Sequence, residues 1–401
     1  MLKLSFLGDI MCEGPFLEAA ARENETYDFS DMLSGLKELL KKSDFVLANL
    51  ETPLAGKEAG YTKTRDLYSF NTPDSFADAV KAAGISFVLT ANNHCCDRGM
   101  EGLERTIKVL DAKGIRHTGT HTIMKNNVPE IVGLGTTKIA IIACTDSTNA
   151  SRNKCKPTLN NVNLLKEQFT TVKTGKKVAI KTFIVRHIVG EQNYMRIRKC
   201  LGYPPKKVSI DNVLDVELMQ QYLDNIEKQI KWAKENADLV LVCPHMGGQF
   251  NVTPGKFSEY VVQKLVDFGA DAVIASHPHI IQKAEIKRGV PCIFSLGNVS
   301  MSMTTMYIIR DELPDYGMIL HLYIDDNQIV RMTYSLIIMI EDQKSYLKVR
   351  TLREEYLRSD NLKKRVIMEN AERIVRRICQ DNTLHITDIP EEFELVKGVE
   401  K

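Results

Sequence analysis

The sequence predicts an α/β protein in which a largely parallel sheet is layered with helices. Two observations support this prediction: short apolar runs of strand length recur along the chain, and stretches with helical spacing of apolar residues separate them. Strands that alternate with helices form parallel sheets covered by helices. The 401 residues are 44% hydrophobic and 26% charged, which is typical of a soluble globular protein with two to three domains, or with one large domain carrying insertions.

Turn-forming or polar residues end each expected strand. The expected strands cover residues 2–7, 45–48, 87–90, 239–243, 272–275 and 292–295. Proline and glycine mark the helices between them, since Pro73 starts one helix and Gly84 ends it. Further helices are expected from about residue 100 to Gly114, over 217–235 and over 257–268.

Residues 151–207 differ in composition from the rest of the chain. They hold 14 Lys and Arg against two acids, a formal charge of +12 in a chain whose total is +2. We expect an inserted subdomain or lid here, with one strand at about 178–185, that either contacts a polyanion or is simply solvated. The near-neutral total excludes a protein that coats nucleic acid through its overall charge.

The pattern changes again in the last quarter of the chain. Two apolar runs at 320–324 and 329–340 flank a turn at 325–327 and predict a β-hairpin, and 362–378 predicts an amphipathic helix. We therefore expect a main domain over residues 1–300, containing the basic insertion, and a C-terminal extension over 301–401 that packs on it.

The number of cysteines and the N-terminal residues indicate the cellular compartment of the protein. Nine cysteines, an odd number without repeated spacing, favour a reducing environment. Gly8 and Asp9 interrupt the first apolar run too early for a signal peptide, and no stretch approaches the roughly 18 apolar residues of a membrane span. The prediction is a cytoplasmic protein without a membrane span, and the sequence leaves its oligomeric state open.

Several common site motifs are absent from the sequence: the P-loop, G-x-G-x-x-G after a strand, H-E-x-x-H, C-x-x-C and G-x-S-x-G. What remains is a set of carboxylates, amides and imidazoles at expected strand ends, where ligands of parallel sheets bind. This set contains Asp9, Glu51, Asn93, His94, His245, His277 and His279. Imidazole and carboxylate suit Zn, Mn, Fe or Ni, so the set predicts a metal site. The alternative is that these residues are solvated loop or capping residues.

His277-Pro278-His279 is the strongest local signal for that site. Proline biases the preceding residue toward the extended region, and in an extended segment residues i and i+2 project to the same side. The two imidazoles are therefore expected to converge.

Other candidates near these motifs receive structural interpretations. Cys95 and Cys96 could form a thiol pair near the metal, but adjacent cysteines are more often packed. His117 and His121 are expected in a loop. The single Trp232 lies in the helix expected over 217–235 and is expected to be a packing residue.

Six motifs, in order, closely resemble those of one known family. The motifs are Gly8-Asp9-Ile10-Met11, Asn49-Leu50-Glu51-Thr52-Pro53-Leu54, Ala91-Asn92-Asn93-His94 with Asp97 and Gly99, His245-Met246-Gly247, Gly269-Ala270-Asp271 followed by His277-Pro278-His279, and Ser295-Leu296-Gly297-Asn298. Together they resemble the CapA family, the bacterial poly-γ-glutamate capsule synthesis (PGA_cap) family, which is related to calcineurin-like metallophosphoesterases. The resemblance covers roughly residues 2–299 apart from the basic segment.

The resemblance implies a four-layer α/β/β/α sandwich that holds one or two divalent ions at the edge of its sheets. By analogy with metallophosphoesterases, one ion would face three residues and a second ion four, with Glu51 bridging both. The first set is Asp9, Glu51 and His279, and the second is Glu51, Asn93, His245 and His277.

The same analogy implies roles for residues beside the metal. His94 would contact the leaving or transferring group and Asp97 would orient it, whereas Asn298 would either bind substrate or shape a turn. Metallophosphoesterases carry a histidine where this chain has Met11, and an aspartate where it has Glu51. CapA-type proteins share both departures, which leaves the number of bound ions open.

Two functions follow as hypotheses. The first is a metal-dependent hydrolase that acts on a phosphoester or on an amide of an anionic polymer such as polyglutamate, with His94 as a proton donor or electrostatic stabiliser. The second is a non-catalytic component of capsule or envelope synthesis that binds a polyanion and keeps the metal site for structure. The absent motif histidine at Met11 and the +12 segment favour the second somewhat.

Overall fold

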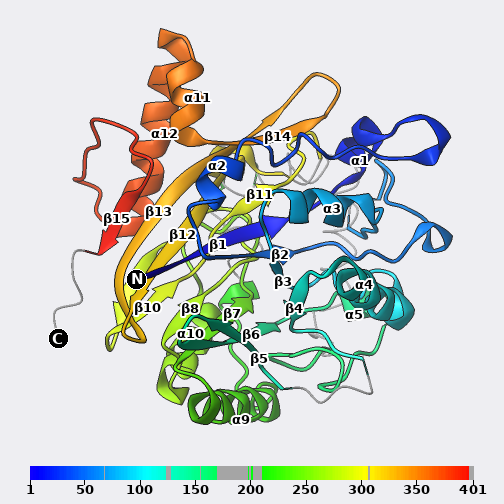
Figure 1. Ribbon diagram of the computed structural model, residues 1–401, viewed down its shortest axis with the longest axis vertical. Coiled ribbons are helices and arrows are strands. Elements are labelled where there is room, and N and C mark those ends of the chain that lie inside the picture. Colours follow the sequence, from blue (N-terminus) through cyan, green and yellow to red (C-terminus); the bar gives the residue numbers. More distant parts are fainter. Residues whose placement is uncertain are drawn as a thin grey trace.

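The computed structural model describes residues 1–66, 68–122, 128–153, 155–168, 197, 200–201, 210–305 and 308–396 (Figure 1). The strand expected at 178–185 lies outside the described residues. Two sheets organise the rest. The helices are α1 (Gly14–Ala20), α2 (Lys37–Leu40), α3 (Ser75–Ala82), α4 (Gly99–Lys113), α5 (Ala150–Asn153), α9 (Gln220–Asn236), α10 (Lys256–Phe268), α11 (Leu352–Arg358) and α12 (Asn361–Cys379).

The first sheet has nine strands in the order β14-β13-β12-β1-β2-β3-β4, with β11 paired to β1 and β15 to β13. Strands β1 to β4 are parallel, whereas β12 to β15 run antiparallel to their neighbours. The strands are β1 (Leu2–Ile10), β2 (Phe45–Leu50), β3 (Phe87–Leu89), β4 (Arg116–Thr118), β11 (Asn298–Ser300), β12 (Tyr316–Asp325), β13 (Gln328–Glu341), β14 (Leu347–Thr351) and β15 (Phe393–Val396).

The second sheet has six strands in the order β5-β6-β7-β8-β10-β9. Its four central strands are parallel, and an antiparallel strand closes each edge. The strands are β5 (Glu130–Leu134), β6 (Thr137–Thr145), β7 (Leu239–His245), β8 (Ala272–Ile274), β9 (Ala284–Lys287) and β10 (Val290–Ile293).

The two sheets pack face to face, and helices cover their outer faces. In β2, Leu47 faces the core between the sheets while Val46 faces the helices α1 and α3; in β6, Ile141 faces the first core while Ile142 faces α9 and α10. Burial on both faces explains why these strands read as continuous apolar runs. Figure 1 shows α3 and α9 on opposite sides of the paired sheets. The structure therefore confirms a four-layer α/β/β/α sandwich.

The C-terminal hairpin is confirmed, and it belongs to the first sheet. Strand β12 pairs antiparallel with β1 over Leu2 to Phe6, and its turn to β13 places Asp326 and Asn327 at φ of 46° and 58°. Two successive left-handed residues are typical of the hairpin turns whose twist matches that of the strands. The expected helix is α12, and its apolar face, with Ile374 and Ile378, joins the core between the sheets.

A buried histidine joins three strands of the first sheet near the chain's C-terminal segment. His321 is fully buried, with Nδ1 2.7 Å from Ser5 Oγ and Nε2 3.0 Å from Ser335 Oγ. Burial, with the nearby positive charge of Lys3, lowers the pKa of His321 to about 3. The imidazole therefore stays neutral in the fold at pH values where an unfolded chain would protonate it.

The lowered pKa of His321 predicts that the folded protein loses stability in acid. Because its pKa is lower in the folded state than the ordinary 6.5, its contribution is complete above pH 6.5 and is lost as pH falls toward 3. The free energy of unfolding should fall by about 1.4 kcal/mol per pH unit on this account. Urea unfolding of wild type and His321→Asn at pH 7 and pH 5 tests this, with a smaller loss expected in the variant. Equal losses in both proteins would contradict it.

Candidate metal centre

The edge where the carboxyl ends of the parallel strands meet brings the predicted polar residues together. Asp9 lies near the end of β1, Glu51 follows β2, and His245 is the last residue of β7. Asn93 and His94 follow β3, and His277 and His279 follow β8. All seven side chains are buried, at no more than 8% exposure. Residues that the sequence spreads over about 270 positions thus share one buried site.

Glu51 lies at the centre of this site. Its Oε1 lies 3.5 Å from His245 Nε2, 3.7 Å from His279 Nε2 and 3.9 Å from His94 Nε2, all beyond hydrogen-bond distance. Among the described residues, neither carboxylate oxygen of Glu51 has a hydrogen-bond partner, although the side chain is fully buried. Burial, reinforced by the nearby charge of Asp9, raises the pKa of Glu51 well above its ordinary value. Burying such a charged carboxylate costs free energy unless a cation lies beside it.

Asp9 is the ionised partner of Glu51. Its Oδ1 accepts a hydrogen bond from Asn49 Nδ2 at 2.8 Å, and its Oδ2 lies 3.2 Å from the His277 backbone N–H and 3.3 Å from His279 Nδ1. Burial alone would raise the pKa of Asp9. The hydrogen bond with His279 and the charges of the histidines outweigh burial, so its pKa lies below the ordinary value.

Two groups of potential ligand atoms share Glu51. Glu51, His277 and His279 form one group, and Asp9, Glu51 and His245 form the other; the atoms of each group lie within 4.8 Å of one another. A shared Glu51 agrees with the bridging position that the resemblance implied. The groups nevertheless pair Asp9 with His245, whereas the implied sets paired Asp9 with His279. The ligand roles of these residues stay predictions.

Asn93 adds an amide oxygen beside these groups. Its Oδ1 lies 2.8 Å from His245 Nε2, and His245 Nε2 lies 3.0 Å from His277 Nδ1. Ser276 Oγ lies 3.0 Å from His245 Nδ1, on the other side of the same ring. One amide oxygen and two imidazole nitrogens therefore converge where a divalent ion could bind. Burial lowers the pKa of His245, so its ring is neutral and suited to metal coordination.

The predicted extended conformation of the His-Pro-His segment is wrong. His277 and His279 have φ of 102° and 57°, so both occupy the left-handed region. The two rings still converge on Glu51, but through a tight turn rather than an extended strand. Proline disfavours the right-handed helical region for the preceding residue, which leaves such a turn open. Left-handed backbone at non-glycine residues costs about 1–3 kcal/mol each and occurs where a site requires it.

Asp97 hydrogen-bonds the ring of His94. His94 Nδ1 donates to Asp97 Oδ2 at 2.6 Å, and the same oxygen accepts the Phe70 backbone N–H at 2.7 Å. Asp97 Oδ1 accepts from Asn153 Nδ2 at 2.9 Å. The Phe70 ring lies 4.3 Å from the His94 ring. These contacts fix the imidazole with Nε2 on the side of Glu51.

Asn298 hydrogen-bonds His279. The Asn298 side chain is fully buried; its Oδ1 lies 2.9 Å from His279 Nδ1, and its Nδ2 donates to the carbonyl oxygens of His279 and Pro314. Pairing of β11 with β1 sets Asn298 opposite Asp9. This close approach requires glycine, because a Cβ at Gly8 would lie 1.9 Å from the Gly297 carbonyl oxygen.

Sequence reasoning missed three polar residues that hold the site. Asn49 bonds Asp9 and lies 3.2 Å from His245 Nδ1, and Asn92 Nδ2 donates to Asn49 Oδ1 at 3.1 Å. Both belong to the motifs quoted above, so their strand-end position was a usable signal. Asn153 lies at the start of the basic segment, and no local pattern marks its contact with Asp97.

Met11 is a core residue in this structure. Its side chain is 1% exposed and packs in the core beneath α1 and α3, on the helix-covered face of the first sheet. The position where metallophosphoesterases carry a histidine therefore serves packing in this chain.

The remaining candidates lie outside the metal centre. Cys95 and Cys96 are buried in the core between the sheets, with their sulfurs 3.8 Å apart. His117 lies in β4, not in a loop, and its Nε2 is 3.2 Å from Asp111 Oδ1. His121 follows that strand and is buried. Trp232 is 37% exposed on α9, so the packed position predicted for it is wrong.

Comparison with known proteins identifies the family. A family model described as bacterial capsule synthesis protein PGA_cap matches residues 3–302. The chain belongs to this family. The resemblance that the motifs indicated is thereby confirmed.

Two curated relatives carry CapA names. The capsule biosynthesis protein CapA of Bacillus anthracis is 26% identical over 298 residues, which cover 74% of this chain and 59% of that protein. The PGA biosynthesis protein CapA of Bacillus subtilis is 22% identical over 298 residues, covering 74% and 63%. The chain thus spans about three fifths of the length of these relatives.

Among solved structures, GAP50, the anchor in the inner membrane complex of Plasmodium, is similar at a TM-score of 0.34 and 12% identity, over 97% of this chain and 98% of that one. The two sheets and their cores define the fold. Within the described part of the chain, no helix has both the length and the apolar character needed to cross a bilayer.

Proposed function

We propose that this PGA_cap protein is a metal-dependent hydrolase of capsule or cell-envelope polymer synthesis, acting on a phosphoester or on an amide of an anionic polymer. The observation that carries the proposal is Glu51, a fully buried carboxylate without a hydrogen-bond partner among the described residues and with three imidazole rings around it. Buried charges are paired or coordinate metals, and these imidazoles face Glu51 without bonding it.

The donor set fits a divalent ion such as Mn, Zn, Fe or Ni. The ligands would be drawn from Asp9, Glu51, Asn93, His245, His277 and His279, all brought together at one edge. Two groups that share Glu51 would accommodate one ion or two. When bound, the ion would supply Lewis-acid activation of water and charge stabilisation.

The chain's own residues would supply a proton donor and would orient the metal ligands. Asp97 holds His94 Nδ1, so His94 Nε2 is the nitrogen available to donate a proton to a leaving group or to stabilise developing negative charge. Asn49 hydrogen-bonds Asp9, and Asn298 hydrogen-bonds His279. Such supporting contacts keep ligands oriented and are required for full metal affinity.

Metal content tests the proposal. Protein reconstituted with Mn, Zn, Fe or Ni should retain at least about one ion per chain by elemental analysis, because mixed imidazole and carboxylate sites bind these metals well. Glu51→Gln should bind less metal, while the metal-free variant should be as stable as metal-free wild type or more so, since a buried charge has gone. A chain that retains no ion under any of the four conditions would contradict the proposal.

A second candidate is a non-catalytic polyanion-binding component with a structural metal site. It is supported by Met11, whose packing removes one expected ligand, and by the +12 charge of residues 151–207. Metal-loaded protein that binds polyglutamate in a salt-sensitive way, yet turns over no phosphodiester, would favour this candidate over the hydrolase.

A further inference from the structure

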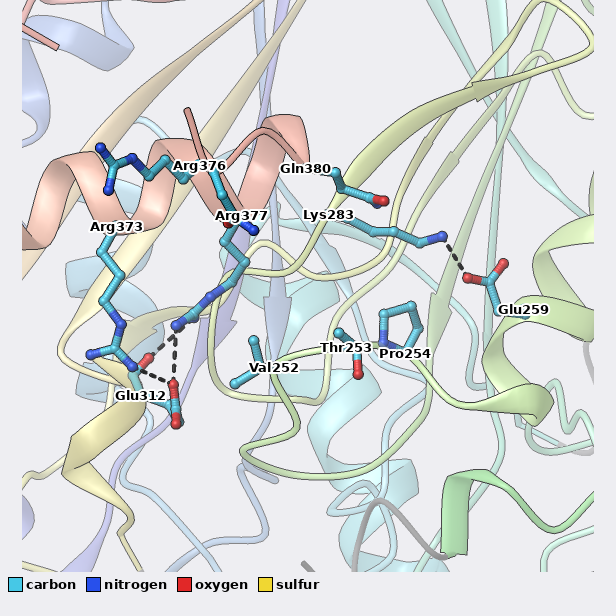
Figure 2. Close-up of a pocket in the computed structure, with 11 residues that line it drawn as sticks. Val252, Thr253, Pro254, Glu259, Lys283, Glu312, Arg373, Arg376, Arg377 and Gln380 are labelled. Carbon is cyan, nitrogen blue, oxygen red and sulfur yellow. Dashed lines mark hydrogen bonds and ion pairs between the residues drawn. The ribbon is translucent and has the colours of Figure 1, made fainter. Parts of the chain in front are cut away.

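A cavity lies on the side of α12, lined by none of the metal-site residues. Its volume is about 550 Å³. Figure 2 shows the side chains that line it. Pockets of a few hundred to about 1,000 Å³ are the usual size for small-molecule sites. Its walls come from the last two turns of α12 and the residues after it, from the loop before α10 and the first turn of α10, from the residue before β9, and from the 3-10 turn Arg310–Glu312. The lining residues are Val252, Thr253, Pro254, Glu259, Lys283, Glu312, Arg373, Arg376, Arg377, Gln380 and Asn382.

Positive charge dominates the lining, with four cationic side chains against two carboxylates. The excess is concentrated at Arg373 and Arg377, which share a single carboxylate oxygen, Glu312 Oε2, at 2.5 Å and 3.2 Å. Figure 2 shows both guanidinium groups converging on Glu312 on one side of the cavity. One carboxylate therefore neutralises only one of two adjacent guanidinium groups.

Arg377 is the fixed member of this pair. Its side chain is 8% exposed, and its Nη1 donates to the carbonyl oxygens of Ile281 and Glu312 at 3.1 Å and 3.2 Å. Arg373 is 46% exposed, so its planar group can present donors to a ligand. A buried cation beside an accessible one forms an anion site that needs little reorganisation.

The opposite wall holds a lysine that is also fixed. Lys283 Nζ pairs with Glu259 Oε1 at 2.5 Å and lies 4.5 Å from the centre of the Phe294 ring. Figure 2 shows Lys283 reaching Glu259, with Val252 to Pro254 between this wall and the arginines. Lys283 is already neutralised by Glu259. A bound anion would therefore be attracted most strongly to the wall that holds Arg373 and Arg377.

The cavity adjoins the loops that shape the metal centre. Gln249 Nε2 lies 3.4 Å from His279 Nε2, and the Phe250 ring lies 5.9 Å from the His279 ring. The same loop continues into Val252 and lines the cavity. Arg377 donates to the carbonyl of Ile281, two residues after His279.

We propose that this cavity is a binding site for a small polyanion with two or more carboxylate or phosphate groups, held by Arg373 and Arg377. The cavity's volume, its unbalanced pair of guanidinium groups and the fixed position of Arg377 beside the accessible Arg373 carry the proposal, which does not depend on hydrolase activity. Both anion classes offer the paired oxygens that guanidinium binds in a bidentate manner.

Isothermal titration with tricarballylate and with pyrophosphate tests the proposal on the full chain as purified. At least one probe should bind, more weakly as salt rises. Arg373→Gln should weaken that binding by about tenfold or more, since a charge-assisted hydrogen bond is lost. Because Arg373 is half-exposed, the variant should fold like wild type, and matched thermal melts check this. The control is Arg358→Gln, an exposed arginine of α11 paired with Glu354, which should bind like wild type.

Binding of tricarballylate alone would identify a carboxylate ligand, and binding of pyrophosphate alone a phosphate ligand. Either result supports the proposal when Arg373→Gln reduces it and Arg358→Gln does not. Binding that is equally strong in Arg373→Gln would place the probe elsewhere, as at the metal centre, and would overturn the proposal. Absence of binding by both probes would do the same.

Discussion

His277→Ala is expected to abolish metal retention and any hydrolytic activity together. His277 belongs to the ligand group with Glu51 and His279, and its Nδ1 lies 3.0 Å from His245 Nε2. Changes to residues that merely support metal ligands already lower affinity by about 10–100-fold, so loss of a direct ligand should lower it at least as much. Elemental analysis after dialysis, together with turnover of a phosphodiester, measures both effects.

Two further variants separate ligand loss from unfolding. His277→Gly removes the same imidazole but suits the φ of 102° at this position, so it should melt at a higher temperature than His277→Ala while retaining equally little metal. His385→Ala replaces a histidine whose side chain is 75% exposed and should keep its metal. If His277→Ala retained a full complement of metal, His277 would not be a ligand.

The strands that the sequence predicted well are those buried on both faces. Strands β2 and β7 read as apolar runs because one face meets the other sheet and the opposite face meets helices. The sequence analysis did not predict β15, whose ladder with β13 depends on a contact about 60 residues away. The division into two sheets came from the family resemblance, since an apolar run does not indicate which sheet it joins.

In the site, too, the residues that local sequence position could group differ from those whose roles depend on distant contacts. Position at a strand end was enough to group Asp9, Glu51 and His245, because parallel strands bring their carboxyl ends to one edge. The role of Asn298 was not predictable locally, since it depends on β11 lying beside β1. Proline's local bias also gave the wrong backbone for His277, where the turn is imposed by contacts with the first sheet, including the bond from its N–H to Asp9.

His94→Asn is expected to separate catalysis from metal binding. His94 Nε2 lies 3.9 Å from Glu51 Oε1, and the side chain belongs to neither ligand group, so metal content should stay near that of wild type. Turnover should fall by about 10²–10⁴, the range for loss of a positioned proton-transfer group. Metal analysis and phosphodiester turnover on the same preparation measure the two quantities.

A matched variant tests whether the orientation of His94 matters as well as its presence. Asn153→Ala removes the hydrogen bond to Asp97 Oδ1 but leaves Asp97 Oδ2 bonded to His94 and to the Phe70 backbone N–H. Its turnover should therefore fall between those of wild type and His94→Asn, at unchanged metal content. Thermal melts must match, because a destabilised core would lower turnover in either variant. Full turnover in metal-loaded His94→Asn would remove His94 from the reaction and would favour the non-catalytic candidate, in which the imidazole only lines the metal site.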